Sequence, residues 1–397
     1  MDQTGASPQP QEYYQGPVAG SGTILAASFE MHRLAACLLE PVGGMYRLAA
    51  WRISPAPDQR PLTVQFHELC RQLGARLQRT LWDDERNGPL LQSPDPVRCP
   101  PLEQVVITAS PRPRLRVWLV GLTEHNSLAA ARGSLAASQS QLIGSVYLNA
   151  RLDAAALARD LDILRPEALV LTGGYENPDA RAHAPIRLLA SLLAAALRRL
   201  PDHACPEIVY AGNSFALQAV AAALPQQARL RSVENVLPAP AQVREQPLAA
   251  ALDDLYEQKC RRIQGFARLA QWGTLPPPIL TVEDSFTRLV LLWMELHGLR
   301  DLCGLHAGGD RWLYVWADGD TNTVHTRYVA PHSAPPHPEQ RPPLRLVSGP
   351  WPGPDSLPGS VRWHDSLGLA PLVAAAGQAS PAAAVQALTH DLLLPPR

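Results

Sequence analysis

The sequence has almost no lysine: Lys259 is the single one, and arginine supplies the remaining basic residues. Acidic and basic residues nearly balance, at 36 and 35, so the formal net charge is -1 and the isoelectric point is about 6.9. A chain with so little net charge exerts no strong long-range attraction on nucleic acid or on an anionic membrane. We therefore expect neither a nucleic-acid partner nor a membrane partner.

Long apolar runs are also missing. The stretch from Leu188 to Leu197 is among the longest, and serine or arginine interrupts it well before the roughly 18 residues that a membrane helix requires. Residues 1–22 lack a basic start followed by an apolar core, so they do not form a secretory signal. They are polar and rich in glycine and proline, which predicts a disordered tail. We expect a cytoplasmic protein.

The cysteines form no paired motif. None of the six lies in a C-x-x-C pair or beside a histidine cluster. Disulfide frameworks belong to short secreted chains, and zinc sites need closely spaced ligands. We therefore expect reduced structural thiols and no metal site. The residues are Cys37, Cys70, Cys99, Cys205, Cys260 and Cys303.

Motifs for nucleotide and cofactor binding are missing as well. The chain has no G-x-G-x-x-G and no Walker loop, so nothing indicates a dinucleotide or a nucleoside triphosphate. The cobalamin-binding pattern D-x-H-x-x-G is absent too, so we expect no direct, base-off binding of cobalamin. We therefore expect the protein to bind no cofactor.

What the chain does contain is a globular composition and a regular alternation of elements. Hydrophobic residues make up 46% and charged residues 18% of its 397 residues, enough for about two or three domains. In the middle segment, short loops join apolar strands to helices, which predicts a parallel sheet with helices on both faces. The expected strands are 115–122, 142–148, 168–172, 207–211 and 229–233, and the expected helices are 123–140, 153–164, 185–200 and 215–224.

Both flanks read as three-strand meanders joined to helices. Before the middle segment, the pattern predicts strands 23–28, 33–40 and 45–53, a helix 62–81, a loop 83–101 and a strand 104–109. After it, the pattern predicts helices 248–272 and 282–297, strands 301–307, 311–316 and 324–329, and a last helix beginning near Ser380.

The middle motifs resemble the MutL-like accessory proteins of glutamate mutase, which are distinct from the mismatch-repair protein of the same short name. The resemblance rests on Val120-Gly121-Leu122-Thr123, Pro166, Leu171-Thr172-Gly173-Gly174, Tyr210-Ala211-Gly212-Asn213 and Val233-Glu234-Asn235-Val236-Leu237-Pro238. It implies an α/β fold in which two actin-like ATPase-type halves flank a Rossmann-like parallel-sheet insert. It also implies an accessory role beside an adenosylcobalamin-dependent mutase. The corresponding domains are 23–112, 113–275 and 276–397; we expect both actin-like halves to be degenerate and the second to be truncated as well.

The three loops that hold phosphate in that superfamily depart from its pattern. The first reads Ala26-Ala27-Ser28-Phe29-Glu30-Met31-His32-Arg33, without the expected aspartate and with a carboxylate that repels phosphate. The second reads Ser110-Pro111-Arg112-Pro113-Arg114, where proline removes N–H donors. The third reads His306-Ala307-Gly308-Gly309-Asp310-Arg311-Trp312-Leu313. We expect a divergent pseudo-ATPase that binds neither ATP nor Mg²⁺ and serves as a scaffold or chaperone-type partner; an active ATPase with altered loops is an alternative.

Several polar and glycine residues follow the predicted parallel strands. Ligands bind at the carboxyl ends of such strands, near a change of strand order, so these residues could line one crevice for a small molecule or a substrate. The alternative is that the glycines only permit tight strand-to-helix turns. The candidates are Thr172, Gly173, Gly174, Gly212, Asn213, Glu234 and Asn235.

Three further features have a structural interpretation and a functional one. Ser214 stands where a hydrolase nucleophile would, but the second glycine of G-x-S-x-G is missing, which favours a helix cap. Asp318-Gly319-Asp320 opens like a calcium loop, but the following residues favour a hairpin turn. Trp312 and Trp316 lie on one face of a strand and could form the core or bind a protein partner.

Overall fold

The computed structural model describes residues 22–42, 45–56, 60–201, 205–307, 312–319 and 323–329. The chain divides into two compact units, each built from two separate segments. Unit 1 comprises Met1–Pro111 and Arg261–Val282, and unit 2 comprises Arg112–Cys260 and Glu283–Arg397. Residues 1–21 of the expected tail, the glycines at 308–309 and the expected helix near Ser380 lie outside the described residues.

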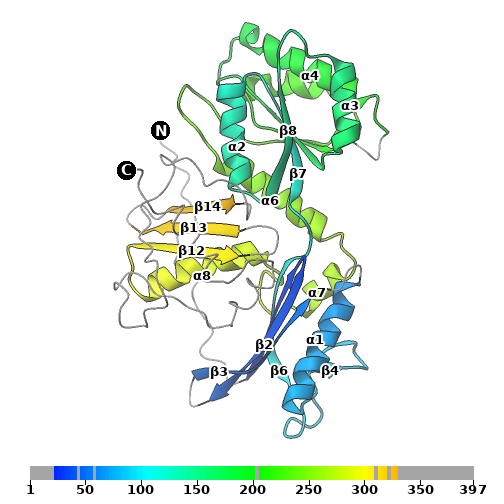
Figure 1. Ribbon diagram of the computed structural model, residues 1–397, viewed down its shortest axis with the longest axis vertical. Coiled ribbons are helices and arrows are strands. Elements are labelled where there is room, and N and C mark those ends of the chain that lie inside the picture. Colours follow the sequence, from blue (N-terminus) through cyan, green and yellow to red (C-terminus); the bar gives the residue numbers. More distant parts are fainter. Residues whose placement is uncertain are drawn as a thin grey trace, which may run out of the picture. The chain divides into compact units, whose positions relative to one another are not determined.

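Unit 1 contains a four-stranded sheet in the order β3-β2-β1-β6, the blue and cyan strands of Figure 1. β1 (Thr23–Glu30), β2 (Arg33–Val42) and β3 (Met45–Pro55) form the predicted antiparallel meander, and β6 (Leu102–Ser110) lies parallel to β1. Burial alternates strictly along β1, as expected for a strand with one face in a core.

Helix α1 (Leu62–Leu77) packs against β2 and β3 through a buried stripe that includes Phe66, Leu69 and Leu73. The predicted end at residue 81 is wrong, because Gln78 adopts a left-handed conformation with φ 50° that terminates the helix. The predicted loop 83–101 also contains part of a short ribbon, β4 (Trp82–Asp83) paired with β5 (Gly88–Pro89).

The single helix predicted over 248–272 is wrong as well. Two helices are present, α6 (Gln246–Cys260) in unit 2 and α7 (Phe266–Trp272) in unit 1. Gly265 separates them with φ +90°, and a Cβ there would lie 2.9 Å from the backbone nitrogen of Thr63. A side chain at this position would meet both strain and a steric clash, so the break requires glycine.

The segment after α7 returns to the sheet of unit 1. Leu280 forms a parallel bridge with Thr108, and the Ala109 nitrogen donates to the Leu280 carbonyl at 2.8 Å. The Thr274 nitrogen donates to Val105 at 2.9 Å on the same strand. Residues 274–280 therefore cover the edge of β6 and extend the sheet.

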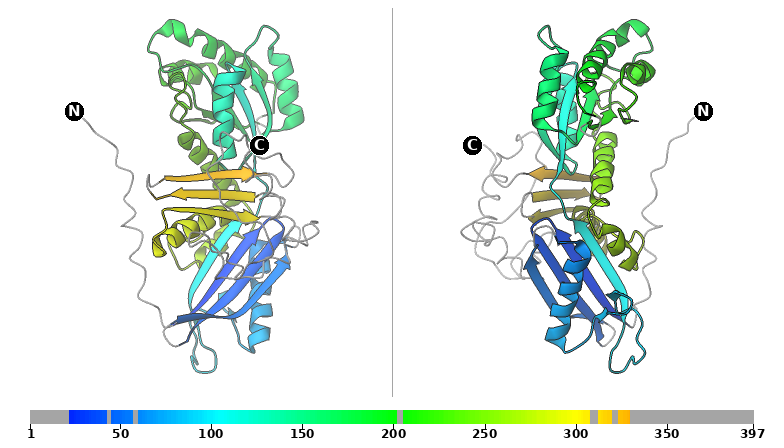
Figure 2. Two further views of the ribbon diagram at one scale, coloured as in Figure 1. Left: turned by 60° about the vertical axis from the view of Figure 1, so that its left-hand side comes forward. Right: turned by 90° about the vertical axis from the view of Figure 1, so that its right-hand side faces the viewer.

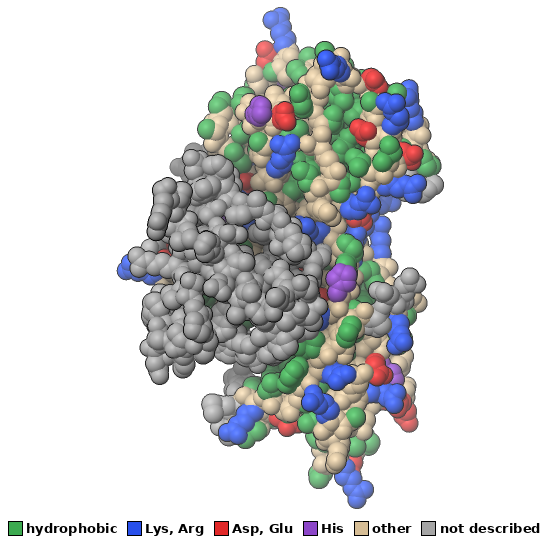
Figure 3. All heavy atoms as spheres, in the orientation of Figure 1, with side chains coloured by type: hydrophobic (Ala, Val, Ile, Leu, Met, Phe, Trp, Pro, Cys, Tyr) green, Lys and Arg blue, Asp and Glu red, His purple; other side chains and the backbone are tan. Residues whose placement is uncertain are grey.

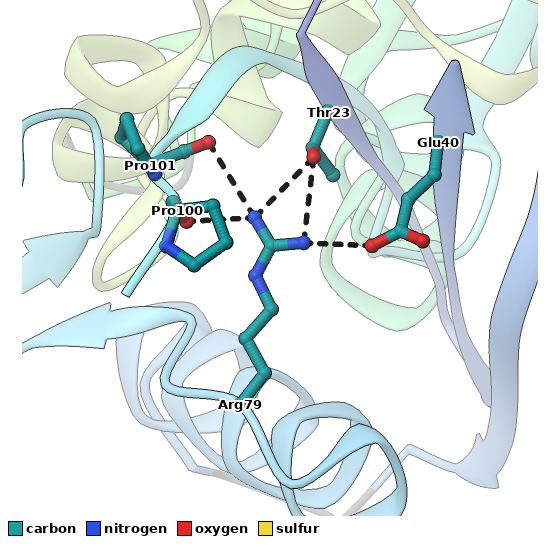
Figure 4. A network of polar contacts seen from close by, with 5 residues as sticks. All are labelled: Thr23, Glu40, Arg79, Pro100 and Pro101. Atoms are coloured by element: carbon teal, nitrogen blue, oxygen red, sulfur yellow. Dashed lines mark hydrogen bonds and ion pairs between the residues drawn. The ribbon is translucent and has the colours of Figure 1, made fainter. Parts of the chain in front are cut away.

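Arg79 forms hydrogen bonds to three separate segments of unit 1 (Figure 4). The guanidinium of Arg79 donates to Glu40 at 2.8 Å, to the Pro100 carbonyl at 2.7 Å and to the Thr23 hydroxyl at 3.3 Å. These residues belong to the end of β2, the segment before β6 and the start of β1. The Arg79 side chain is only 9% exposed, so its charge depends on these partners.

Unit 2 contains a five-stranded parallel sheet in the order β11-β10-β9-β7-β8, which confirms the mixed α/β fold. The apolar strand predicted at 168–172 has the same bounds in the structure, and the other predicted strands end within two residues of theirs. The strands are β7 (Leu115–Gly121), β8 (Ser140–Tyr147), β9 (Ala168–Thr172), β10 (Glu207–Tyr210) and β11 (Leu230–Ser232).

Helices pack on this sheet, and the hydrophobic core lies between them and the strands (Figure 2). α4 (Ala184–Leu197) packs against α3 (Ala154–Leu164) and α5 (Leu217–Ala223), and their leucines and alanines meet the buried Trp118 and Leu169. The expected helix 123–140 begins with a π-helical turn, Glu124–Leu128, continues as α2 (Ala129–Ala136) and ends earlier than predicted. Thr123 caps it as expected, accepting from the Ser127 nitrogen at 3.2 Å.

The second predicted meander lies in unit 2. It is a three-stranded antiparallel sheet, drawn in yellow and orange in Figure 1. Its strands are β12 (Asp301–Ala307), β13 (Trp312–Asp318) and β14 (Thr323–Val329). α8 (Val282–Leu296) covers one face, where Val290 packs against the buried Leu313 and Val315. Within the described part of the chain, no helix is both long and apolar enough to cross a bilayer.

Candidate functional site

The strand order of the parallel sheet reverses at one point. β7 is first in the chain but lies between β8 and β9, so the connections leave it in opposite directions. In open α/β sheets of this order, ligands bind beside the carboxyl ends of the strands at this reversal. The loops after β7, β9, β10 and β11 therefore define the candidate site.

The two glycines after β9 are there for steric reasons. Gly173 has φ +137° and Gly174 has φ +80°, both in regions that side chains rarely adopt. A Cβ at Gly173 would lie 2.5 Å from Leu122 Cγ, and one at Gly212 would lie 2.7 Å from the Gly173 carbonyl. The loops after β7, β9 and β10 thus approach one another too closely for larger residues.

Asn213, only 1% exposed, joins the loops after β9 and β10. Its side-chain nitrogen donates to the Asn177 carbonyl at 3.1 Å, and its side-chain oxygen accepts from the Phe215 nitrogen at 3.1 Å. The same Asn177 carbonyl lies 2.8 Å from His183 Nε2. Asn213 therefore caps the helical turn that follows, a role that the sequence had suggested for Ser214.

Asn235 makes a similar connection from the loop after β11. Its amide donates to the Gly174 carbonyl and to Glu176 Oε1, both at 2.9 Å, and its oxygen accepts from the Leu237 nitrogen at 3.1 Å. Glu176 also accepts from the Ser214 nitrogen at 3.0 Å and from its hydroxyl at 2.5 Å. These bonds connect the loops after β9, β10 and β11.

The ionisation of Glu176 follows from these contacts. Burial alone would raise the pKa of its carboxyl, but hydrogen bonds from Ser214 and Asn235 and the positive charge of Arg244 outweigh that effect. The pKa of Glu176 therefore lies below its usual value, and the group is a carboxylate at neutral pH. Burial, followed by the charge of Glu176, raises the pKa of Tyr210, whose hydroxyl donates to the Asn213 carbonyl at 2.8 Å.

The structure brings the candidate residues together, except for Glu234. Thr172 belongs to the group, because its hydroxyl donates to the Ala211 carbonyl at 3.0 Å and joins β9 to the end of β10. Glu234, whose side chain is 63% exposed, instead forms an ion pair with Arg244 at 3.0 Å. Sequence reasoning missed Glu176 and Asn177, although both follow the glycine pair within three residues. The polar side chains Thr172, Glu176, Asn213 and Asn235 all bond to protein groups, an arrangement that holds the loops in shape.

The position of the first altered phosphate loop is a short turn in unit 1. Met31 and His32 connect β1 to β2, and Glu30 forms an ion pair with Arg33 across that turn. At the second altered loop, the Ser110 hydroxyl accepts from the Val282 nitrogen at 3.1 Å, and Pro111 follows.

A cavity of about 300 Å³ lies beside these two loops. Its lining includes Glu30, Met31 and Pro111, together with Leu62 and Gln65 of helix α1. The lining holds one carboxylate, Glu30, and one guanidinium, Arg60, among otherwise neutral residues, so it carries no excess of positive charge for a phosphate.

Trp316 lies on β13, on the face opposite α8, and Trp312 begins the same strand. Leu313, Val315 and Ala317 occupy the alternate positions around Trp316 and are buried under the helix. Trp316 is partly exposed and stacks on His325 of β14, with ring centroids 5.0 Å apart. The side chain of Trp312 lies outside the described residues.

The described residues contain no group of three His, Cys, Asp or Glu side chains that could hold a metal ion. None of the six cysteines forms a disulfide, and burial raises the pKa of Cys37 and Cys70. Basic and acidic side chains are both scattered over the described part of the face in Figure 3, in line with the balanced composition.

These features define a class: a mixed α/β protein with internally bonded loops at the carboxyl ends of a parallel sheet. The family model described as MutL protein matches residues 62–309. The chain therefore belongs to that family, the glutamate mutase MutL-like proteins.

The other comparisons add little. No curated protein matches the chain. Among solved structures, T. thermophilus RuvC in complex with a Holliday junction substrate aligns at 10% identity over 61% of this chain and 98% of that one. The TM-score is 0.15, too low to support an inference about fold or function.

Proposed function

We propose that this chain is a divergent, non-hydrolysing member of its family that binds a protein partner, a subunit of an adenosylcobalamin-dependent mutase. The observation that carries the non-hydrolysing part is the ion pair between Glu30 and Arg33 at the first altered loop. A phosphate beside Glu30 would meet a carboxylate, and Arg33 is already engaged by that carboxylate. Neither ATP, Mg²⁺ nor cobalamin is part of the proposed activity.

The proposal includes an actin-like arrangement of the flanking halves. Support comes from unit 1, where an antiparallel meander β3-β2-β1 is followed by β6 parallel to β1 and then by residues 274–280 at its edge. The proposed domains keep the bounds 23–112, 113–275 and 276–397, with the Rossmann-like sheet in the middle.

Partner binding is proposed for the face of β13 opposite α8. Support comes from the partial exposure of Trp316 on the side of the sheet that α8 leaves uncovered. Aromatic side chains of this kind are enriched where proteins bind one another. The alternative, a small-molecule site at Gly173 and Gly212, is less favoured because the polar side chains there already bond to one another.

The nucleotide part is tested with the purified full chain, ATP and Mg²⁺. We expect no saturable thermal stabilisation and no phosphate release above the rate without protein. Saturable stabilisation together with phosphate release would establish an active ATPase with altered loops and overturn this part of the proposal.

The partner part is tested by co-expression with the cobalamin-binding and catalytic subunits of a mutase from the same organism, followed by size exclusion. We expect co-elution, and we expect Trp316→Ala to weaken it. Trp51→Ala is the matched control, because Trp51 is also exposed, at 42%, but lies on β3 of unit 1. Failure of the wild-type chain to co-elute, or equal effects of both variants, would contradict the proposal.

A further inference from the structure

The carboxylate of Glu176 receives hydrogen bonds from two other loops of unit 2. Its Oε1 accepts from the Ser214 nitrogen at 3.0 Å and from the Asn235 side-chain nitrogen at 2.9 Å. Its Oε2 accepts from the Ser214 hydroxyl at 2.5 Å. Three donors from the loops after β10 and β11 thus converge on one anionic group, which the loop after β9 carries.

The position of the Asn235 donor does not depend on Glu176. The nitrogen of that side chain also donates to the Gly174 carbonyl at 2.9 Å, and its oxygen accepts from the Leu237 nitrogen at 3.1 Å. Asn235 is only 4% exposed, which restricts its side chain further. An amide nitrogen carries two N–H groups, so one can hold Gly174 while the other meets Glu176. This donor therefore stays in place when the carboxylate is removed.

Ser214 is held by the cap of its own helical turn. The Asn213 side-chain oxygen accepts from the Phe215 nitrogen at 3.1 Å, and the Asn213 carbonyl accepts from the Ala216 nitrogen at 3.0 Å. The cap thus uses the two nitrogens that follow Ser214 and leaves the Ser214 nitrogen to donate to Glu176. The Ser214 donors are therefore also positioned without help from the carboxylate.

The backbone of the loop after β9 is fixed separately from the Glu176 side chain. The Glu176 nitrogen donates to the Pro238 carbonyl at 2.8 Å, and the Asn177 carbonyl accepts from the Asn213 side-chain nitrogen at 3.1 Å. Replacing the Glu176 side chain by a methyl group therefore vacates the space beside the donors without releasing the loop.

The electrostatics at this position favour a negative group. Burial raises the pKa of Glu176, but the hydrogen bonds from Ser214 and Asn235 and the positive charge of Arg244 outweigh it. Arg244 also pairs with Glu234 at 3.0 Å, so its charge is shared between two carboxylates. Hydrogen bonds to a charged acceptor are stronger than those between neutral groups, so the three donors contribute most when an anion lies between them.

The acceptor is a pair of neighbouring oxygens on one anionic group. Phosphate and carboxylate groups of ligands present the same pair, and ligands of open α/β sheets bind at this carboxyl edge. Ser214 is exposed and Glu176 is partly exposed, so ions from solvent can reach the position. The donors therefore have the arrangement of an oxyanion site whose occupant belongs to the chain itself.

We propose that the loops after β9, β10 and β11 form a binding site for a small oxyanion, a carboxylate or a phosphate, and that Glu176 fills this site and excludes such a ligand. A ligand's oxyanion would have to displace a carboxylate that is tethered to the same loops, and it would approach that carboxylate against charge repulsion. The inference concerns unit 2 alone and does not depend on the proposed partner or on the altered loops of unit 1.

The test removes the carboxylate and offers a free one. The full-length Glu176→Ala variant is unfolded thermally in sodium chloride, sodium formate and sodium phosphate at equal ionic strength and neutral pH. In chloride, we expect its midpoint to lie about 3–6 °C below that of the wild type. In formate or phosphate, the difference from the wild type in the same salt should shrink by at least about half and then level off, because the ion fills the vacated site.

Three further variants separate a vacated oxyanion site from a general loss of charge. Glu176→Gln is neutral but keeps a side chain of the same size in the site, so we expect no response to either ion beyond that of the wild type. Glu234→Ala removes the other carboxylate beside Arg244 and should also respond like the wild type. Adding Ser214→Ala to Glu176→Ala removes the hydroxyl donor, and half recovery should then need about tenfold more ion.

Saturable recovery of Glu176→Ala by either ion, without recovery of Glu176→Gln, supports the proposal, and the ion that acts shows how large an oxyanion the site admits. Absence of recovery by both ions, or equal recovery of the two variants, would overturn it. If Glu176→Ala does not stay folded in chloride, the same titrations are followed as the return of the folded circular dichroism signal, and the same outcomes decide.

Discussion

The side-chain amide of Asn235 lies 2.9 Å from Glu176 Oε1 and joins the loop after β11 to the loop after β9. The same amide holds the Gly174 carbonyl, so one side chain fixes both ends of the glycine-rich turn. These two bonds hold the loop after β11 against the loop after β9.

Removing that side chain should weaken the fold measurably. Asn235→Ala leaves the Gly174 carbonyl and the Leu237 nitrogen without their partner, and we expect a loss of about 1–3 kcal/mol in the free energy of unfolding. Urea unfolding followed by circular dichroism measures it. Asn149→Ala is the control, because Asn149 is exposed and bonds only within its own turn; it should stay within about 0.5 kcal/mol of the wild type. Equal losses would contradict the role of Asn235.

Gly173 should tolerate no side chain. Alanine there would meet Leu122 at 2.5 Å and adopt φ +137°, so we expect Gly173→Ala to cost about 2–4 kcal/mol. Gly298→Ala separates the two effects, because Gly298 also has a positive φ, +57°, but nothing lies within 4 Å of a Cβ. It should cost about 1 kcal/mol. Comparable costs for the two variants would show that crowding at Leu122 is unimportant.

The buried guanidinium of Arg79 should be essential for unit 1. Arg79→Met keeps much of the side-chain volume but leaves Glu40, Thr23 and the Pro100 carbonyl without their donor, and we expect a loss of about 2–3 kcal/mol. Arg98→Met is the control, since the Arg98 side chain is 87% exposed in its ion pair with Asp95. A surface pair of this kind contributes at most about 1 kcal/mol. Thermal unfolding at two salt concentrations compares them.

The protonation of Asp253, on helix α6, also predicts how overall stability changes with pH. Burial raises the pKa of this carboxyl from the ordinary 3.8 to about 8, so the folded chain holds a proton that the unfolded chain releases. This contribution is complete below about pH 4 and is lost as pH rises towards 8. We expect the stability of Asp253→Asn relative to the wild type to increase over that range and to level off above it. A constant difference between the two chains would contradict the assignment.

The sequence was most informative where local pattern and burial agree. β9 has its predicted bounds because its five residues are apolar and lie between Pro166 and the glycine pair. The interruption of the helix at Gly265 was missed, because it depends on contact with Thr63, far away in the chain. An isolated glycine within a helical pattern does not reveal such a contact.

The candidate site shows the same division. Its glycines and asparagines could be located because they follow apolar strands. Glu176 could not, because its partners Ser214 and Asn235 lie 38 and 59 residues further on. No local pattern encodes which distant amide a carboxylate meets, and the same holds for Asp253 and Gln139, which are 114 residues apart.

The bridge between Thr108 and Leu280 has a consequence for synthesis on the ribosome. Unit 1 draws on Arg261–Val282 to complete its sheet, so the first 111 residues leave β6 with a bare edge until that segment has been made. Unpaired strand edges readily associate with other chains. The intervening unit 2 segment, Arg112–Cys260, is synthesised before Arg261–Val282. Its parallel sheet can therefore form while the edge of β6 is still unpaired.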